Sequence, residues 1–490
     1  MSQLYSKLIG SLALPWVSVL THSNFWQLYQ RLRRDSFREA CAPSRDEQLD
    51  RLQELLRFAY GHVPFYRERM DALGLPPKSI RSFEDFSRLT PTTKADIAAN
   101  FPDRLTASEQ TYKPWRYVST SGTVERLTVI QDFRKRDLVR ATQLLALDSA
   151  TGYQPGMRYM EIPPDICRNV CGVADTVEPG VFGYFLEHAW ARKLTDPEVV
   201  SNLRGMIERQ LIYRLKLLPS FGAEGLVQQP ATLDQYLQQI DNYRPHVLKA
   251  LPAYLYLLAL HMQERKLPPP RITGGLMPMG SSASPHMKAV IESAFGRGVH
   301  EDYGCAELGA IAAECGSKQG LHPFAGLFFV EIVRNGNAVR DGQLGRVLIT
   351  DLYNYAMPLL RYDIGDVGIL RRDPCKCGLP GDRLEIHGRL QDCLVAGDGD
   401  VVTPDRLTDL MIERSDVLGF QLELRDRRQA FLQVVPRNGK TANLDEIRKL
   451  MRDLLGSQLE IQARHVPTVL PEPGGKFRLV KNASAANGIL

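Results

Sequence analysis

The sequence has no apolar run long enough to cross a membrane. Its most apolar stretch, Leu8 to Leu20 (LIGSLALPWVSVL), is 13 residues long and contains Pro15, whereas a spanning helix needs about 20 apolar residues. The stretch also lacks the small-residue cleavage site of a secretory signal. We expect no membrane span and an N-terminal helix that packs on the core. A weak signal peptide or a helix on a membrane surface are the alternatives.

Cysteine and net charge are also scarce. Eight cysteines in 490 residues are unlike the framework of a small secreted scaffold, so we expect reduced thiols in the cytoplasm, some of them metal ligands. The 61 basic and 56 acidic residues give a net charge of +5. They are interspersed and form no basic stripe, which argues against a nucleic-acid partner. With 44% hydrophobic residues and no low-complexity tract, the composition is that of an ordinary globular enzyme.

Hydrophobic patterning predicts an α/β fold. Residues 44–61 place Ser44 and Glu47 in capping-box spacing ahead of a leucine-rich face, which indicates an amphipathic helix. From about 115 to 370, β-rich runs such as 327–333 and 347–350 alternate with helical segments, a pattern typical of large sheets flanked by helices.

A change of composition after residue 388 predicts two domains, residues 1–388 and residues 389–490. The second should be a small α+β domain. Its expected elements are a helix near 404–414, strands near 419–425 and 429–435, a helix near 444–456 and a last strand near 461–466.

The stretch YVSTSGTVERLTVI (residues 117–130) contains a Ser/Thr/Gly turn. Ser121, Gly122 and Thr123 would offer hydroxyls and backbone amides to an oxyanion without needing an ionised donor. Such clusters are usually surface loops, so the turn alone does not establish a phosphate site.

Four later blocks give this turn a context. The blocks are DYGCAELG (302–309), LLRYDIGD (359–366), HGRLQD (387–392) and PEPGGKFRLV (471–480), and they are accompanied by HVPFYRERM (62–70), LTPTTKADI (89–97), IAAECGSKQGLH (311–322), GRVLITDLYNYAMPLLRY (345–362) and CKCGLP (375–380). In order and spacing the chain resembles the adenylate-forming superfamily of acyl-CoA synthetases and adenylation domains. It is most similar to the branch of phenylacetate-CoA ligases and CapK-type capsule-biosynthesis proteins. The resemblance implies that superfamily's fold, with a mobile C-terminal domain.

The resemblance also implies roles for single residues. Lys476 matches the adenylation lysine between the carboxylate and the α-phosphate, and a flexible ammonium suits such a contact. Glu307 matches the glutamate that holds Mg²⁺, a cation that prefers oxygen ligands. From position alone these would be a solvated lysine near the C-terminus and an acidic residue at a helix start.

Further nucleotide contacts follow from the same resemblance. Tyr303, with Gly304, would lie along the adenine, and Asp366 would accept the two ribose hydroxyls because a carboxylate is an acceptor-only group. Arg389 would add a second ribose contact. Asp392 falls at the hinge about which the small domain would turn.

Two pairs of possible metal ligands lie about fifty residues apart. They are Cys315 with His322 and Cys375 with Cys377, and glycines lie close to both pairs. Mixed Cys/His sets favour tetrahedral Zn²⁺, and the branch often shows the same set. We expect a closed structural zinc without a catalytic role. The alternative is four unconnected residues, with the cysteines buried as small hydrophobes.

Two departures from the family pattern stand out. The phosphate loop continues with Val124, Glu125 and Arg126, and a carboxylate beside a triphosphate is repelled by about 1 to 4 kcal/mol. Gly280 and Ser281 stand where the family often has Gly-Glu. The alternatives for Glu125 are that it points away or pairs with Arg126, which would then add positive charge, so we expect a weakened loop. The second change puts the adenine-side contact in doubt and would also suit an unusual acid.

The expected function is ATP-dependent activation of an aryl or medium-sized carboxylic acid, with transfer to coenzyme A or to the phosphopantetheine of an acyl carrier protein. Transfer to an amine and a non-catalytic scaffold that binds a ligand are the alternatives. The identity of the acid and the oligomeric state, for which a homodimer is one candidate, stay open. The acyl pocket is expected to include Phe221, Gly222, Tyr254, Met279, Gly280 and Ser281.

Overall fold

A computed structural model provides the structure of the protein. It describes residues 2–20, 23–34, 43–108, 114–119, 127–164, 181–191, 199, 203, 205–221, 225, 227–426, 428–437, 439–472 and 477–482.

Helices dominate the first hundred residues, and side-chain caps mark where several of them begin. The helix expected at 44–61 is confirmed as α5 (Arg45–His62): the hydroxyl of Ser44 accepts from the Glu47 amide, and the Glu47 carboxylate accepts from the Ser44 amide. This capping box satisfies amides that the helix itself cannot bond. The other helical elements here are α1 (Ser2–Leu8), the π-helical η1 (Ile9–Ala13), α2 (Leu14–Leu20), α3 (Phe25–Arg34), α6 (Pro64–Ala72), η2 (Pro77–Ser79), α7 (Phe83–Ser87) and α8 (Lys94–Asn100).

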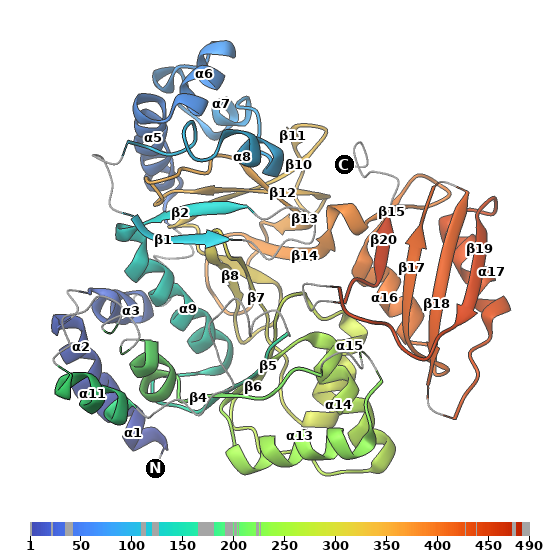
Figure 1. The fold of residues 1–490 in the computed structure, drawn as a ribbon. Coiled ribbons are helices and arrows are strands. Elements are labelled where there is room, and N and C mark those ends of the chain that lie inside the picture. Colours follow the sequence, from blue (N-terminus) through green and yellow to red (C-terminus); the bar gives the residue numbers. More distant parts are fainter. Residues whose placement is uncertain are drawn as a thin grey trace.

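An eight-stranded antiparallel sheet forms the centre of the molecule (Figure 1). Its strand order is β11-β10-β12-β13-β14-β9-β8-β7, and the β-rich runs at 327–333 and 347–350 are confirmed as β10 and β12. The strands are β7 (Asp302–Cys305), β8 (Gly309–Glu314), β9 (Leu321–Pro323), β10 (Phe328–Arg334), β11 (Asn337–Ala338), β12 (Leu344–Asp351), β13 (Tyr362–Arg371) and β14 (Arg383–Arg389).

A second, parallel sheet has the order β4-β3-β5-β6. Its strands are joined by helical crossovers, as parallel pairing requires, and α14 and α15 belong to a second hydrophobic cluster beside it. The two-stranded hairpin β1-β2 stands apart from both sheets. The elements are β1 (Pro114–Ser119), β2 (Thr128–Asp132), η3 (Phe133–Lys135), α9 (Arg136–Thr151), β3 (Tyr159–Ile162), α11 (Val181–Trp190), η4 (Glu208–Ile212), β4 (Leu215–Leu217), α13 (Pro230–Tyr243), β5 (Val247–Ala250), α14 (Pro252–Arg265), β6 (Gly275–Pro278) and α15 (Pro285–Phe295).

The C-terminal hundred residues fold around their own hydrophobic cluster. The strand expected last, near 461–466, is not the last one: β20 follows it and pairs in parallel with β17. Three residues carry no periodic pattern, so only this pairing defines β20 as a strand. The elements are η6 (Leu390–Asp392), β15 (Leu394–Val395), β16 (Val401–Val402), α16 (Pro404–Ile412), β17 (Val417–Leu424), β18 (Gln429–Pro436), α17 (Leu444–Leu455), β19 (Glu460–His465) and β20 (Val480–Asn482).

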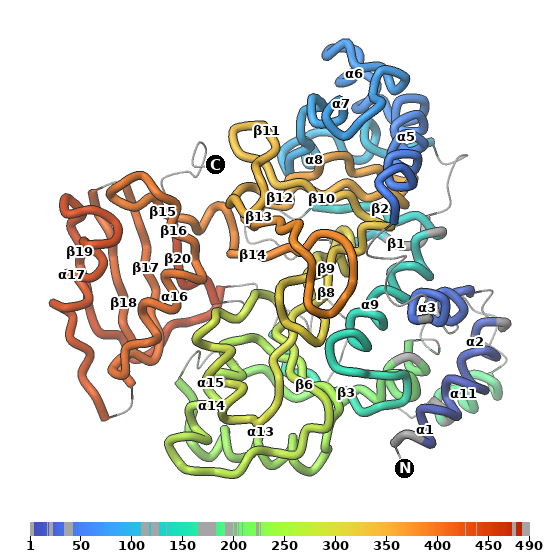
Figure 2. Tube along the Cα trace, turned by 180° about the vertical axis from the view of Figure 1, so that it is seen from behind, coloured from blue at the N-terminus to red at the C-terminus, as the bar shows by residue number. Residues whose placement is uncertain are grey.

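The C-terminal part contacts the rest of the chain beside α14, α15 and β14 (Figure 2). The amide of His286, at the start of α15, donates to the Asp409 carboxylate of α16 over 3.2 Å. Ile412, Val435 and Val469 join the second hydrophobic cluster. The two parts are therefore held together by apolar packing and by polar contacts.

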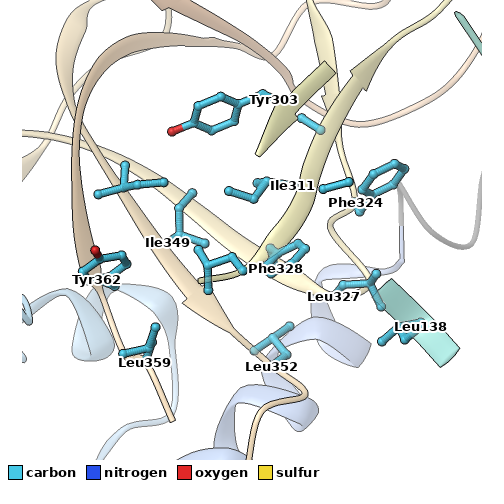
Figure 3. Packing of buried hydrophobic residues seen from close by; sticks show 14 of the residues in the cluster. Leu138, Tyr303, Ile311, Phe324, Leu327, Phe328, Ile349, Leu352, Leu359 and Tyr362 are labelled. Carbon is cyan, nitrogen blue, oxygen red and sulfur yellow. The ribbon is translucent and has the colours of Figure 1, made fainter. Parts of the chain in front are cut away.

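The largest hydrophobic cluster lies on the antiparallel sheet, where Phe328 and Ile349 pack beside Tyr303 and Tyr362 (Figure 3). Tyr303 and Tyr362 are thus themselves buried members of this cluster. Within the described ranges, no helix combines the length and the apolarity that a bilayer-spanning segment needs.

Candidate functional site

Asp366 and Arg389 face each other across two neighbouring strands. They are Cα partners in the β13–β14 ladder, so the register places the two side chains at the same level of the sheet. Arg389 Nε lies 3.1 Å from Asp366 Oδ1, and the guanidinium also donates to the carbonyl oxygen of Ile364 over 3.0 Å. The aspartate is buried, and the arginine compensates its charge.

Tyr303 reaches the same carboxylate from β7. Its hydroxyl donates to Asp366 Oδ2 over 2.8 Å. Burial and the Asp366 charge raise the pKa of Tyr303 well above its ordinary value, so the phenol stays a donor. Next to it, Gly304 pairs with β8 so closely that a Cβ would overlap the carbonyl oxygen of Gly309. A glycine is therefore required beside the tyrosine.

Glu307 lies in the turn between β7 and β8, and its side chain is buried. The hydroxyl of Tyr362, on β13, donates to Glu307 Oε1 over 3.1 Å. The side-chain amide of Gln131, on β2, donates to the Glu307 carbonyl oxygen over 2.9 Å. The turn that carries the expected Mg²⁺ ligand is therefore tied both to the central sheet and to the β1–β2 hairpin.

The expected phosphate-loop residues Ser121, Gly122 and Thr123 lie outside the described residues, as do Val124, Glu125 and Arg126. The described chain on either side belongs to the hairpin, where Ser119 pairs with Thr128. The loop therefore starts and ends at one end of this hairpin, whose second strand reaches Glu307 through Gln131. The phosphate role stays a prediction.

Lys476 also lies outside the described residues, but the chain directly after it is described. Phe477 packs edge-to-face on Tyr254 of α14, with ring centroids 6.2 Å apart. Arg478 Nε donates to Asp392 Oδ1 over 2.7 Å. The segment after Lys476 is thus held at one side by the large part of the chain and at the other by the expected hinge residue.

Of the residues expected around the acyl group, Phe221 and Tyr254 stack on each other at 4.2 Å and are buried in the second hydrophobic cluster. Met279 is half-buried at the end of β6, and Gly280 and Ser281 are exposed before α15. Gly222 lies outside the described residues. Phe221 and Tyr254 form a packed wall, and their contact with an acyl group stays a prediction.

Cys315, His322, Cys375 and Cys377 come together as the metal-site hypothesis expects. Their ligand atoms all lie within 4.8 Å of one another. The Cys315 and Cys375 Sγ atoms are 3.7 Å apart, and Cys377 Sγ lies 3.4 Å from His322 Nε2. A tetrahedron around Zn²⁺ has S–S edges of about 3.8 Å and S–N edges of about 3.6 Å when built from ordinary bond lengths. The donor set therefore fits zinc.

Reasoning from the sequence missed three residues that support the site. Tyr362 and Arg478 lie inside the motifs already quoted, so their proximity to Asp366 and Lys476 could have drawn attention to them. Gln131 has no such signal, because it is 176 residues from its partner in sequence and only the tertiary fold brings the two together.

No protein-family model matches the chain. It is 29% identical over 359 residues to a phenylacetate-coenzyme A ligase of Thermus thermophilus, which is 71% of each chain. It is 26% identical over 393 residues to the Escherichia coli protein of the same name, which is 78% of this chain and 79% of that one. It is 23% identical over 259 residues to protein CapK of Staphylococcus aureus, which is 51% of this chain and 56% of that one.

Solved structures agree in fold. A 2-hydroxyisobutyryl-CoA ligase in its postadenylation state superposes with a TM-score of 0.67 at 20% identity, over 91% of each chain. The same enzyme in its thioesterification state gives a TM-score of 0.54 at 21% identity over the same share of each chain. The chain is thus similar in sequence to phenylacetate-coenzyme A ligases and to CapK, and it shares the fold of an acyl-CoA ligase that forms an acyl-adenylate.

Proposed function

We propose that the protein activates a carboxylic acid with ATP and then transfers the acyl group to a thiol, as an AMP-forming acid–thiol ligase. One observation carries this proposal: Tyr303 and Arg389, from two different strands, both contact the carboxylate of Asp366 on a third strand. Glu307 lies beside them, held by Tyr362. In this arrangement the Asp366 carboxylate would accept hydrogen bonds from a ribose, and the nearby Glu307 carboxylate would hold a cation. A reaction that uses a nucleotide requires both.

In the first step, a carboxylate oxygen of the acid would bond to the α-phosphorus of ATP while the bond to pyrophosphate breaks. Asp366 would accept the ribose hydroxyls, and Arg389 and Tyr303 keep its two oxygens oriented. Lys476 would stabilise the negative charge that gathers between the acid and the α-phosphate. Glu307 would hold Mg²⁺, which when bound offsets phosphate charge.

In the second step, a thiolate would attack the acyl carbon and release AMP. The contact between Asp392 and Arg478 ties the expected hinge to the segment that follows Lys476. A turn about Asp392 would break this contact and withdraw the lysine, which makes room for the thiol. Coenzyme A and a carrier-protein phosphopantetheine are both candidate acceptors.

We also propose that the Cys315–His322–Cys375–Cys377 cluster binds a structural Zn²⁺. All four positions are filled by protein, so no site for a reacting water is left. The cluster joins the β13–β14 connection to the end of β8. The β14–β9 ladder there consists of a single partner pair, Leu384 with Leu321, so a metal would reinforce the sheet at its weakest junction.

The decisive test is pyrophosphate release from ATP and Mg²⁺ with a panel of aryl, aliphatic and amino acids, with hydroxylamine present to trap activated acyl groups. We expect a hydroxamate from one acid class, aryl or medium-sized. Adding coenzyme A, a phosphopantetheinylated carrier protein or an amine then identifies the acceptor. If folded protein released no pyrophosphate and formed no hydroxamate with any acid of a broad panel, the proposal would be contradicted. That result would favour a non-catalytic scaffold that binds a ligand.

The junction between the two parts of the chain should be sensitive to pH through His387. Its Nδ1 lies 2.8 Å from Asp405 Oδ2 on α16, and its Nε2 lies 3.7 Å from Glu385. Burial alone would lower the pKa of His387, but the hydrogen bond to Asp405 and the charges of Asp405 and Glu385 outweigh it and raise the pKa to about 9. The imidazolium therefore stabilises the folded state fully below about pH 6.5, its unfolded pKa, and this stabilisation is lost as the pH rises through about 9.

Melting temperatures of the wild type and of His387→Gln between about pH 6 and 10 test this expectation. The wild type should be more stable by about 1 to 2 kcal/mol at the acidic end, because partial solvent contact reduces the full effect. The difference should vanish at the alkaline end, and Asp405→Asn should give the same pattern. A difference that does not change with pH would show that packing, and not the charge of His387, holds the junction.

A further inference from the structure

The N-terminal helical segment exposes a line of large apolar side chains. Leu4, Leu8, Leu12 and Trp16 follow one another at intervals of four residues and have 66, 49, 57 and 67% of their surface exposed. In a regular α-helix such a series drifts around the axis. The wider π turn of η1 (Ile9–Ala13) counters this drift, so the four residues stay in line. We call them the apolar stripe.

The opposite side of the same segment is anchored in the molecule. Ile9 and Leu14 are buried, and the Ser6 hydroxyl donates to the Pro155 carbonyl oxygen over 2.7 Å. Gly156 permits this close approach, since a Cβ there would lie 3.0 Å from the ring of Tyr5. The stripe is therefore not an unpacked core face but the outer side of a docked helix.

A second helix extends the apolar surface. On α11, Phe185, Leu186 and Trp190 are exposed, Trp190 to 87%. Figures 1 and 2 both show α1, α2 and α11 side by side at the end of the molecule that carries the N-terminus, away from the C-terminal part. Two exposed tryptophans and several leucines thus gather on one end.

The surroundings of the stripe are cationic. The first 34 residues contain four basic side chains and no aspartate or glutamate. Two of the four, Lys7 and Arg33, line a pocket of about 320 Å³ between α1, η1 and α3, together with Ser6, Ser11, Trp26 and Gln30. Arg33 also pairs with Asp148 at 2.8 Å. The lining contains no carboxylate, and it offers hydroxyl, amide and cationic donors next to exposed leucines.

We propose that the apolar stripe and α11 form a face that binds the surface of an anionic lipid bilayer. The helices would lie in the plane of the interface, with leucines in the acyl boundary and tryptophans at the headgroup level, where their amphipathic rings are favoured. Lys7 and Arg33 would face the lipid phosphates. A segment without acidic residues suits a negatively charged surface, which attracts each nearby cation.

A second copy of the chain is the less suitable occupant. In a two-fold symmetric dimer the same face meets itself, which would bring the exposed Lys7, Arg31 and Arg33 of both copies together with one exposed carboxylate from α11 of each copy, Glu187. Like charges at such a contact oppose association. A bilayer with anionic headgroups meets no such penalty.

Co-sedimentation of the full-length protein with vesicles tests the proposal. We expect the wild type to pellet with vesicles that contain one third phosphatidylglycerol and two thirds phosphatidylcholine. With vesicles of pure phosphatidylcholine, we expect it to stay largely in solution. The double variant Trp16→Ser/Trp190→Ser should lose at least about tenfold in vesicle affinity, because its two aromatic anchors at the headgroup level are gone. Lys7→Gln should weaken binding to anionic vesicles alone.

Leu470→Ser is the matched control, because Leu470 is 57% exposed but lies on the C-terminal part. This variant should bind vesicles like the wild type. Circular dichroism and hydroxamate formation from a soluble acid should be unchanged in all variants, so failure of this proposal is separable from failure of the proposed ligase activity. A wild type that stays in solution with anionic vesicles would overturn it. So would a wild-type dimer that the tryptophan variant dissociates, because the face would then be covered by a second copy.

Discussion

Lys476→Ala should lower the rate of acyl-adenylate formation by at least ~100-fold while the protein stays folded, in line with the loss of one transition-state donor. The reaction brings a carboxylate and a triphosphate together, so negative charge accumulates at the α-phosphorus. Phe477, the residue directly after the lysine, packs on Tyr254 of the large part of the chain. Pyrophosphate exchange or hydroxamate formation measures the effect.

Thioester formation from a preformed acyl-adenylate and the acceptor thiol should be far less affected, because no bond to the phosphate chain is made there. Lys449→Ala is the matched control. Lys449 is an exposed lysine of the same part of the chain, on α17, and its loss should leave both half-reactions unchanged. Wild-type adenylation by Lys476→Ala would show that this lysine has been assigned the wrong role.

Loss of the proposed zinc should unfold the protein at a lower temperature and weaken ATP binding. Structural zinc contributes folding free energy directly, roughly 10 kcal/mol or more in small zinc domains, and each kcal/mol shifts the melting temperature by roughly 2 to 4 °C in a domain of 150–250 residues and by less in a larger one. Chelation or Cys377→Ser should therefore lower the melting temperature by about 10 °C.

The effect on ATP follows from the sheet order. Tyr303 and Glu307 belong to the β7–β8 side of the sheet, whereas Asp366 and Arg389 belong to β13 and β14. The single-pair junction between β14 and β9 separates these halves, and the cysteine–histidine cluster spans it. Without the metal, the halves should lose their mutual alignment, and the KM for ATP should rise more than kcat falls.

Elemental analysis of the purified protein should find about one zinc per chain, as expected for a closed tetrahedral site. Cys305→Ser removes a thiol that lies outside the cluster, and this variant should retain the zinc. A wild-type protein that contains no metal, or a Cys377→Ser variant with unchanged zinc content and melting temperature, would refute the structural role.

Local sequence was sufficient for much of the fold. The capping residues around Ser44 predicted α5 to within one residue at each end, because a cap acts over a single helical turn. Ser284 also caps the first turn of α15, and Gly296 follows its last residue, so local sequence sets the ends of this helix as well. The motifs assigned Tyr303, Asp366 and Arg389 to one site, and these residues do lie together, whereas nucleotide binding there stays a prediction. The residue types assigned the two pairs of possible metal ligands to one cluster, and their ligand atoms do come together.

The tertiary structure decided the features that depend on contacts between residues far apart in the sequence. The three-residue strand β20 exists because β17 offers it a partner, and the bond from Gln131 to Glu307 joins segments that no periodicity relates. The same holds for the outer face of the N-terminal helical segment. Apolar residues lie on more than one side of it, and docking against Gly156 and α3 determines that Ile9 and Leu14 are buried while Leu8 and Leu12 are left exposed. A local pattern reflects backbone preference and periodicity, whereas these features depend on which distant surface each residue packs against.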